Sequence, residues 1–154
     1  MKLLNVSFGL YAFLPPGWLF MAFVILAEAF LMSLYLTRKI FNGLVYKSAV
    51  VSNVVSGLFG IIVSMALNGG WWLVVWFPWV SRHEVNIHSS QALWGLVIYY
   101  FAALVLSVLI ELWINHKILK KQYTFKKTLI ATQIANAFSY AIGAILLVYL
   151  LFSH

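Results

Sequence analysis

Four apolar segments, each about twenty residues long or longer, dominate this chain and decide what it can fold into. They cover residues 17–36, 46–67, 92–114 and 128–152. A segment of about 20 apolar residues spans a bilayer as a helix, and within lipid each backbone polar group must bond inside its own segment. Because 64% of the chain is hydrophobic and 8% is charged, a soluble domain of this size is excluded. The sequence therefore predicts a single all-α domain, a four-helix transmembrane bundle over residues 1–154.

The distribution of basic residues predicts the orientation of the spans. Eight of the ten basic residues lie in or beside the two turns that follow the first and third spans: Arg38, Lys39, Lys47, Lys117, Lys120, Lys121, Lys126 and Lys127. Cytoplasmic loops carry an excess of Lys and Arg, so both turns are predicted to be cytoplasmic and both termini to lie outside. The implied location is a bacterial inner (plasma) membrane. All of these basic residues except Lys47 are assigned to lipid headgroups, and the charge of +7 does not indicate nucleic-acid binding.

Residues 68–91 connect the second and third spans and are rich in tryptophan. Four of the seven tryptophans occur here, namely Trp71, Trp72, Trp76 and Trp79. Tryptophan is enriched at membrane–water interfaces, whereas Pro78 and the glycine pair at 69–70 oppose a further spanning helix. The segment is predicted to be interfacial or re-entrant and to lie outside.

The two halves of the chain share polar landmarks at one constant offset. Glu28 and Glu111 are 83 positions apart, and the same separation holds for the paired members of two motifs, Asn53-x-x-Ser56-x-x-x-Gly60 and Asn136-x-x-Ser139-x-x-x-Gly143. Four matches without a gap favour a duplicated helical hairpin. The predicted copies are residues 17–67 and 92–152, in the same orientation across the membrane.

Each repeated motif places its polar and small residues on one helix face, because positions i, i+3 and i+7 lie together. Asn53 has about the same depth as Glu28, so these side chains are expected to meet across the first hairpin, and Glu111 and Asn136 across the second. The serine and glycine positions are predicted to serve helix packing, since small residues let backbones approach. These positions are Ser56, Ser139, Gly57, Gly60 and Gly143.

The two intramembrane carboxyl groups have alternative interpretations. Glu28 lies near the middle of its span, where burial favours the protonated form. It is either a hydrogen-bonded clasp between hairpins or a site for an ion, a proton or a cationic ligand, and the two readings are equally supported. Glu111 lies six residues before Lys117. For Glu111 a structural role is therefore favoured over an ion or proton site, because its carboxyl group is expected to reach the cytoplasmic edge or to pair with a lysine.

The sequence contains no pattern that indicates catalysis. There are no cysteines, which removes thiolate metal sites and thiol redox chemistry. Histidines at 83, 88, 116 and 154 lie outside the middle of any span and form no convergent metal motif. Phosphate-loop and nucleophile motifs are also missing. We therefore expect no cofactor, no metal and no enzymatic activity.

Three stretches resemble the cyanobacterial filament-integrity (septal-junction) family of membrane proteins and its uncharacterised bacterial relatives. The shared features are a Glu-Ala pair in an early span, an Asn-x-x-Ser-x-x-x-Gly helix and a late Ala-Asn-x-x-Ser-Tyr helix. They fall here at Glu28-Ala29, Asn53/Ser56/Gly60 and Ala135-Asn136/Ser139-Tyr140. The resemblance covers the spans and implies a scaffold or channel subunit at cell–cell junctions.

The sequence favours a non-catalytic integral membrane subunit that acts as a scaffold, an assembly factor or a junction component. Its expected partners are membrane lipid and either other membrane subunits or further copies of itself. The alternative is a small oligomeric channel or transporter for ions or protons that uses Glu28 and Glu111. A membrane enzyme acting on lipid is a weaker third reading.

Overall fold

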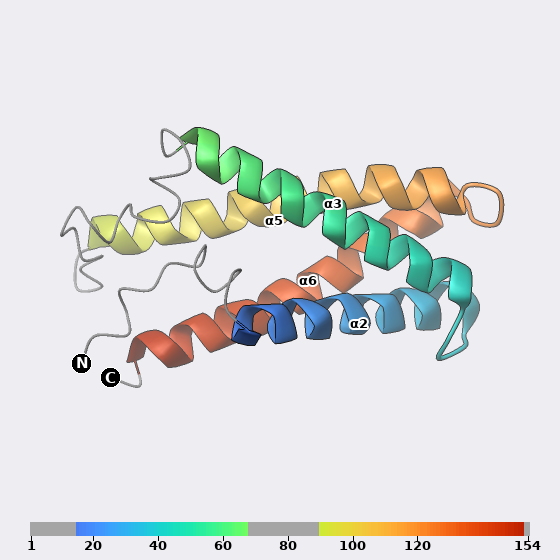
Figure 1. The fold of residues 1–154 in the computed structure, drawn as a ribbon, viewed down its shortest axis with the longest axis horizontal. Helices are drawn as coiled ribbons and strands as arrows, with labels where there is room; N and C mark the ends of the chain where they lie inside the picture. The colour runs from blue at the N-terminus through green and yellow to red at the C-terminus, as the bar shows by residue number, and fades with distance from the viewer. Residues whose placement is uncertain (1–14, 68–89, 153–154) are drawn as a thin grey trace.

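The structure of the protein, a computed structural model, describes residues 15–67 and 90–152. These residues form four α-helices: α2 (Pro15–Thr37), α3 (Gly43–Leu67), α5 (Ser90–Leu119) and α6 (Phe125–Phe152). No strand occurs in the ranges covered (Figure 1). Three helices contain a stretch long and apolar enough to cross a membrane, at Leu19–Thr37, Tyr100–Leu119 and Phe125–Leu146. The described part of the chain is therefore all-helical and has the character of a membrane protein.

The helices begin and end near the predicted positions, with one informative difference. Helix α2 begins at Pro15, as expected of a proline, whose missing N–H costs nothing in a first helical turn. Helix α5 continues to Leu119, beyond the predicted end at residue 114, so the lysine at 117 is helical. The tryptophan-rich connection, with Trp71, Trp72, Trp76 and Trp79, lies outside the described residues, as do residues 1–14.

The turn between α2 and α3 is held by side chains that bond to the backbone. Arg38 has a φ of 58°, the left-handed conformation that commonly ends a helix. Ser33 Oγ donates to the carbonyl oxygen of Lys39 at 2.9 Å. Asn42 then caps α3, because its Oδ1 accepts from the second and third N–H groups of that helix at 3.1 and 3.2 Å. The two helices are thereby joined in a compact antiparallel hairpin.

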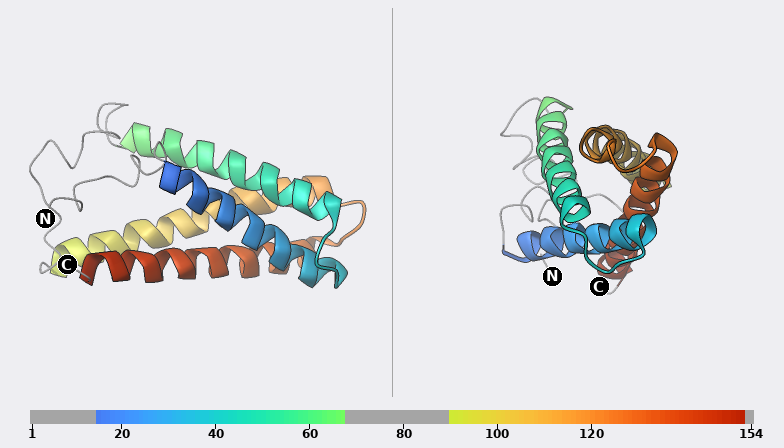
Figure 2. Two further views of the ribbon diagram at one scale, coloured as in Figure 1. Left: turned by 60° about the horizontal axis from the view of Figure 1, so that its bottom comes forward. Right: turned by 90° about the vertical axis from the view of Figure 1, so that its right-hand side faces the viewer.

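Each helix packs against two others. Helix α2 contacts α3 and α6, and α5 likewise contacts α3 and α6. The views in Figures 1 and 2 show that the α2–α3 and α5–α6 turns lie at the same end of the bundle. The eight basic residues from 38 to 127 are all exposed near that end. One end of the described bundle therefore presents a ring of positive charge.

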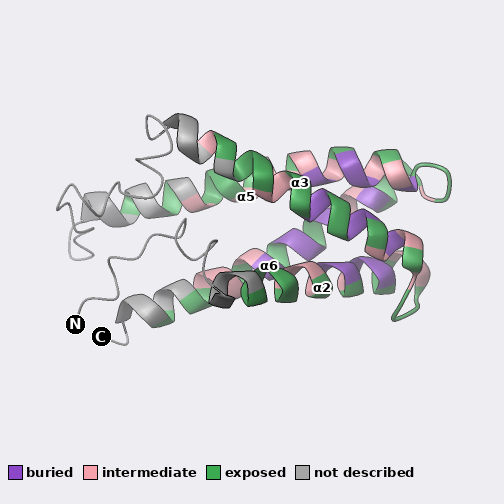
Figure 3. Ribbon diagram, in the orientation of Figure 1, coloured by how far each residue is buried: buried purple, intermediate pink, exposed green. Residues whose placement is uncertain are grey.

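The interior is more polar than the surface that surrounds it. Eleven polar side chains are buried in the described residues, compared with eight apolar ones. Large apolar side chains such as Leu26, Ile98 and Phe101 are instead exposed. The buried residues are concentrated from the middle of the bundle towards the turns (Figure 3). This distribution is the reverse of that in a soluble domain and suits a bundle whose outer surface meets lipid tails.

Candidate functional site

Glu28 lies in the interior of the bundle, on the face of α2 between α3 and α6. Its side chain is 1% exposed. Asn53 Nδ2 on α3 lies 2.8 Å from Glu28 Oε2 and donates to it. Ser139 Oγ on α6 lies 2.5 Å from Glu28 Oε1. The contact with Asn53, predicted from similar depth in the hairpin, is confirmed, and the contact with Ser139 joins Glu28 to the other hairpin.

Glu111 on α5 occupies the corresponding place and is 2% exposed. Asn136 Nδ2 on α6 donates to Glu111 Oε2 at 2.7 Å, which confirms the second expected pair. Ser56 Oγ on α3 lies 2.8 Å from Glu111 Oε1. Ser107 Oγ, one turn earlier on α5, lies 2.9 Å from the same oxygen. Glu111 therefore has side-chain partners on three helices.

The prediction that Glu111 reaches the membrane edge or pairs with a lysine is wrong. The carboxyl group points into the bundle, where amide and hydroxyl partners satisfy it. Lys117 is exposed, and its Nζ lies 3.5 Å from the ring centroid of Trp113. Because α5 remains helical through both residues, Lys117 stands on a different face from Glu111. A cation–π contact at the surface thus replaces the expected ion pair.

The contacts of the two glutamates are reciprocal. Each carboxyl group bonds to the asparagine of its own hairpin, 25 residues later in the chain, and to the serine of the other hairpin. We call these six residues the polar clasp: Glu28, Asn53, Ser56, Glu111, Asn136 and Ser139. The clasp ties α2 to α6 and α5 to α3, and so links two segments that are distant in sequence.

The serines of the clasp limit where its protons lie. Ser56 Oγ is within hydrogen-bond distance of Glu111 and also 3.1 Å from the carbonyl oxygen of Asn53. Ser139 Oγ has the same choice between Glu28 and the carbonyl oxygen of Asn136, at 3.0 Å. A hydroxyl group has one proton, so both contacts are hydrogen bonds only if the carboxyl group donates. The geometry therefore accommodates a protonated carboxyl group at either site.

A second polar layer lies between the clasp and the turns, and sequence reasoning did not find it. Asn115 on α5 is fully buried and its Oδ1 accepts from Ser48 Oγ at 2.7 Å. Its Nδ2 donates to Thr132 Oγ1 at 3.1 Å and lies 3.8 Å from Met32 Sδ. The buried amide group of Asn115 therefore contacts side chains from the three other helices. Its signal in the sequence was a lone asparagine in a mostly apolar run.

The packing assignment of the three glycines holds at two positions. A Cβ atom added at Gly143 would lie 2.6 Å from Tyr100 Oη, and one at Gly57 would lie 3.1 Å from Met21 Cε. Each of these glycines therefore leaves room for a side chain from a neighbouring helix. Gly60 is exposed, and an added Cβ atom there would meet nothing within 4 Å. The assignment of Gly60 to helix packing stays a prediction, because no described residue reaches it.

The basic residues assigned to lipid headgroups, Arg38, Lys39, Lys117, Lys120, Lys121, Lys126 and Lys127, are all exposed. In the described part of the chain, no group of three or more histidine, cysteine, aspartate or glutamate side chains is placed to hold a metal ion.

The imidazole ring of His116 packs edge-on against the ring of Phe125, with ring centroids 5.1 Å apart.

Comparison of the chain with protein-family models, with curated proteins and with solved structures finds no match. The polar clasp and its surroundings therefore carry the functional argument.

Replacing either asparagine of the clasp is expected to weaken the bundle. Asn53→Leu removes the bond to Glu28, and Asn136→Leu removes the bond to Glu111. Each change should lower the free energy of unfolding by about 1 kcal/mol, the order measured for interhelical hydrogen bonds in membranes. Titration of the purified protein with a denaturing detergent measures the effect. Two variants with the stability of the parent would show that these contacts contribute nothing.

Proposed function

We propose that the protein is a non-catalytic integral membrane subunit that acts as a scaffold, an assembly factor or a cell–cell junction component. The reciprocal clasp is the observation that carries this proposal. It places both intramembrane carboxyl groups in bonds that hold the two hairpins together, and such bonds serve the structure of the bundle. The partners are membrane lipid and either other membrane subunits or further copies of this chain.

The proposed arrangement in the membrane follows from the exposed basic residues at one end of the bundle and from the apolar outer surface. Helix α3 is the fourth span, beside the three helices with a membrane-spanning stretch. The hairpins are copies of one ancestral unit, and the tryptophan-rich connection lies at the outer interface. The ring of exposed basic residues faces the cytoplasm of a bacterial cell, where Lys and Arg are retained and anionic headgroups attract them.

The alternative function is a channel or transporter for ions or protons that uses Glu28 and Glu111. Intramembrane acids often serve transport, and at least one carboxyl group in the clasp can hold a proton. The hydrogen bonding of the two carboxyl groups favours the scaffold. Each carboxyl group already has partners on both hairpins, so binding an ion would require breaking bonds that the bundle uses.

Glu28→Gln separates the two functions. Glutamine keeps the shape of a protonated glutamate and can donate and accept, but it cannot ionise. For a scaffold, we expect the variant to match the parent in unfolding and in oligomeric state. Purified parent and variant should both give liposomes whose proton, Na⁺ and K⁺ fluxes equal those of empty liposomes.

The control is Glu111→Gln, which makes the matching change in the other hairpin. If the parent protein conducts ions or protons and a well-folded Glu28→Gln variant does not, the scaffold function is refuted and the transporter function is established. Loss of folding in the glutamine variant would also contradict the proposal, because a protonated clasp tolerates the exchange.

A further inference from the structure

Gln133 is a polar side chain on the outer surface of α6. It is exposed, and it lies within the membrane-spanning stretch Phe125–Leu146. At about 1.5 Å per residue it is roughly 12 Å along the helix from Phe125. Lipid tails offer a carboxamide no hydrogen bonds, and an unsatisfied polar group in hydrocarbon is costly. The position of Gln133 therefore points to a partner outside this bundle.

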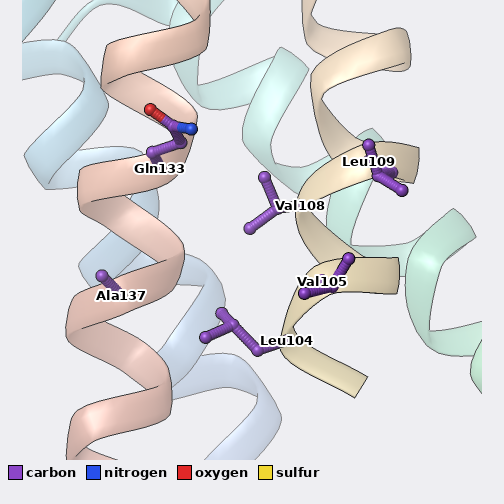
Figure 4. A pocket seen from close by; sticks show the side chains of 6 residues that line it. All are labelled: Leu104, Val105, Val108, Leu109, Gln133 and Ala137. Atoms are coloured by element: carbon purple, nitrogen blue, oxygen red, sulfur yellow. The ribbon is translucent and has the colours of Figure 1, made fainter. Parts of the chain in front are cut away.

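Small residues continue the stripe that begins at Gln133. Ala137 and Ala141 follow at intervals of four, on the same face of α6, and both are exposed. Two small residues four apart let a second helix approach closely in a membrane. Beside this stripe, α5 and α6 form a groove of about 400 Å³ (Figure 4), lined by Leu104, Val105, Val108, Leu109, Gln133 and Ala137.

The equivalent face of α3 provides an internal comparison. The residues 83 positions before Gln133, Ala137 and Ala141 are Val50, Val54 and Leu58, and all three are exposed. They are large and apolar, which suits a surface covered by lipid. The same stripe on α6 is instead polar at one position and small at the next two. The difference indicates that protein, rather than lipid, covers the α6 stripe.

We propose that a second copy of this chain covers the α6 stripe, through a two-fold symmetric contact between the two α6 helices. A carboxamide has two donors and one acceptor with two lone pairs, so two Gln133 side chains satisfy each other with two hydrogen bonds. A two-fold contact brings identical residues together. Ala137 and Ala141 allow the backbones to approach, and the exposed side chains of Ile134 and Phe138 flank the contact.

This proposal rests on the proposed function, which includes self-association among its partners, and it assigns the surface that performs it. The chain lacks cysteine, so single cysteines report proximity without background. Gln133→Cys and Ala137→Cys are oxidised in native-like membranes, where all copies share one orientation. A disulfide requires Cα atoms within about 7 Å, so both variants should give covalent dimers. The matched control is Val50→Cys, which should remain monomeric.

A second measurement uses fluorescence energy transfer between labelled copies in liposomes. Gln133→Val, which installs the residue found at the matched position on α3, should raise the dimer Kd about threefold to tenfold. Ala137→Leu should raise it by at least about tenfold, because the larger side chain separates the backbones. Val50→Ala should leave it unchanged. Unfolding transitions equal to that of the parent show that each variant is folded.

Several outcomes would overturn the proposal. Equal cross-linking at 50 and 133 would show random collision, and cross-linking at neither position would show that α6 is not in contact. Cross-linking of Gln133→Cys to a different polypeptide, with none between copies, would assign the stripe to another protein. The scaffold function has a separate test, because it is refuted by ion flux through the parent protein that the Glu28→Gln substitution abolishes. The result of that flux measurement does not depend on whether the dimer forms.

Discussion

Glu111→Leu is expected to lower the free energy of unfolding by about 2–4 kcal/mol, the largest effect of any single change in the clasp. Interhelical hydrogen bonds in membranes are worth about 0.6 kcal/mol on average and up to about 1.7 kcal/mol. Glu111 makes contacts with Ser56, Ser107 and Asn136, and all three are lost. The Asn136 amide would also be left buried without its carboxyl acceptor, which adds a desolvation cost.

Glu111→Gln is the matched control and should cost less than about 1 kcal/mol, since glutamine can still donate and accept. Leu109→Ala, on the exposed surface of the same helix, should change stability by no more than about 0.5 kcal/mol. Detergent-induced unfolding followed by circular dichroism measures all three. A leucine variant as stable as the glutamine variant would show that the clasp does not hold the hairpins together.

The clasp also predicts coupling between hairpins. Ser56→Ala should weaken the parent but have little further effect in the Glu111→Leu background, because its partner is already absent. A double-mutant cycle isolates this pairwise energy. Additive effects would mean that the 2.8 Å contact between Ser56 and Glu111 does not contribute to stability.

The second large effect is an all-or-none labelling pattern that follows from the ring of basic residues. Single cysteines at Arg38 and Lys120, one in each turn, should react with a membrane-impermeant reagent only after the cytoplasmic side is opened. A cysteine at Trp76, in the predicted outer connection, should react in intact cells. The physical reason is that Lys- and Arg-rich turns are retained in the cytoplasm.

Labelling at positions 38 and 120 from opposite sides of the membrane would contradict two parallel hairpins, since both turns lie at one end of the bundle. Labelling of both from the outside would invert the whole orientation. A cysteine at Ala135, which is fully buried, is the control and should remain unlabelled until the protein is denatured.

The sequence by itself determined the helical segments and the partners within each hairpin. Apolar length predicts a membrane-spanning segment because the bilayer has a fixed thickness. Within a hairpin, the rise per residue sets the depth of Glu28 and Asn53 below their shared turn. That depth was sufficient to predict their contact, and likewise the contact between Glu111 and Asn136.

Only the tertiary structure decided which hairpin residues meet across the bundle. When a helix is apolar on almost every face, the periodicity of its apolar residues does not show which face packs against a neighbouring helix. The pairing of Ser139 with Glu28 and the inward direction of Glu111 therefore depended on how the four helices pack against one another. The role of Asn115 as a core residue was likewise visible only in the structure, where side chains of three neighbouring helices contact its amide group. A buried amide needs such partners, and the sequence does not show which residues supply them.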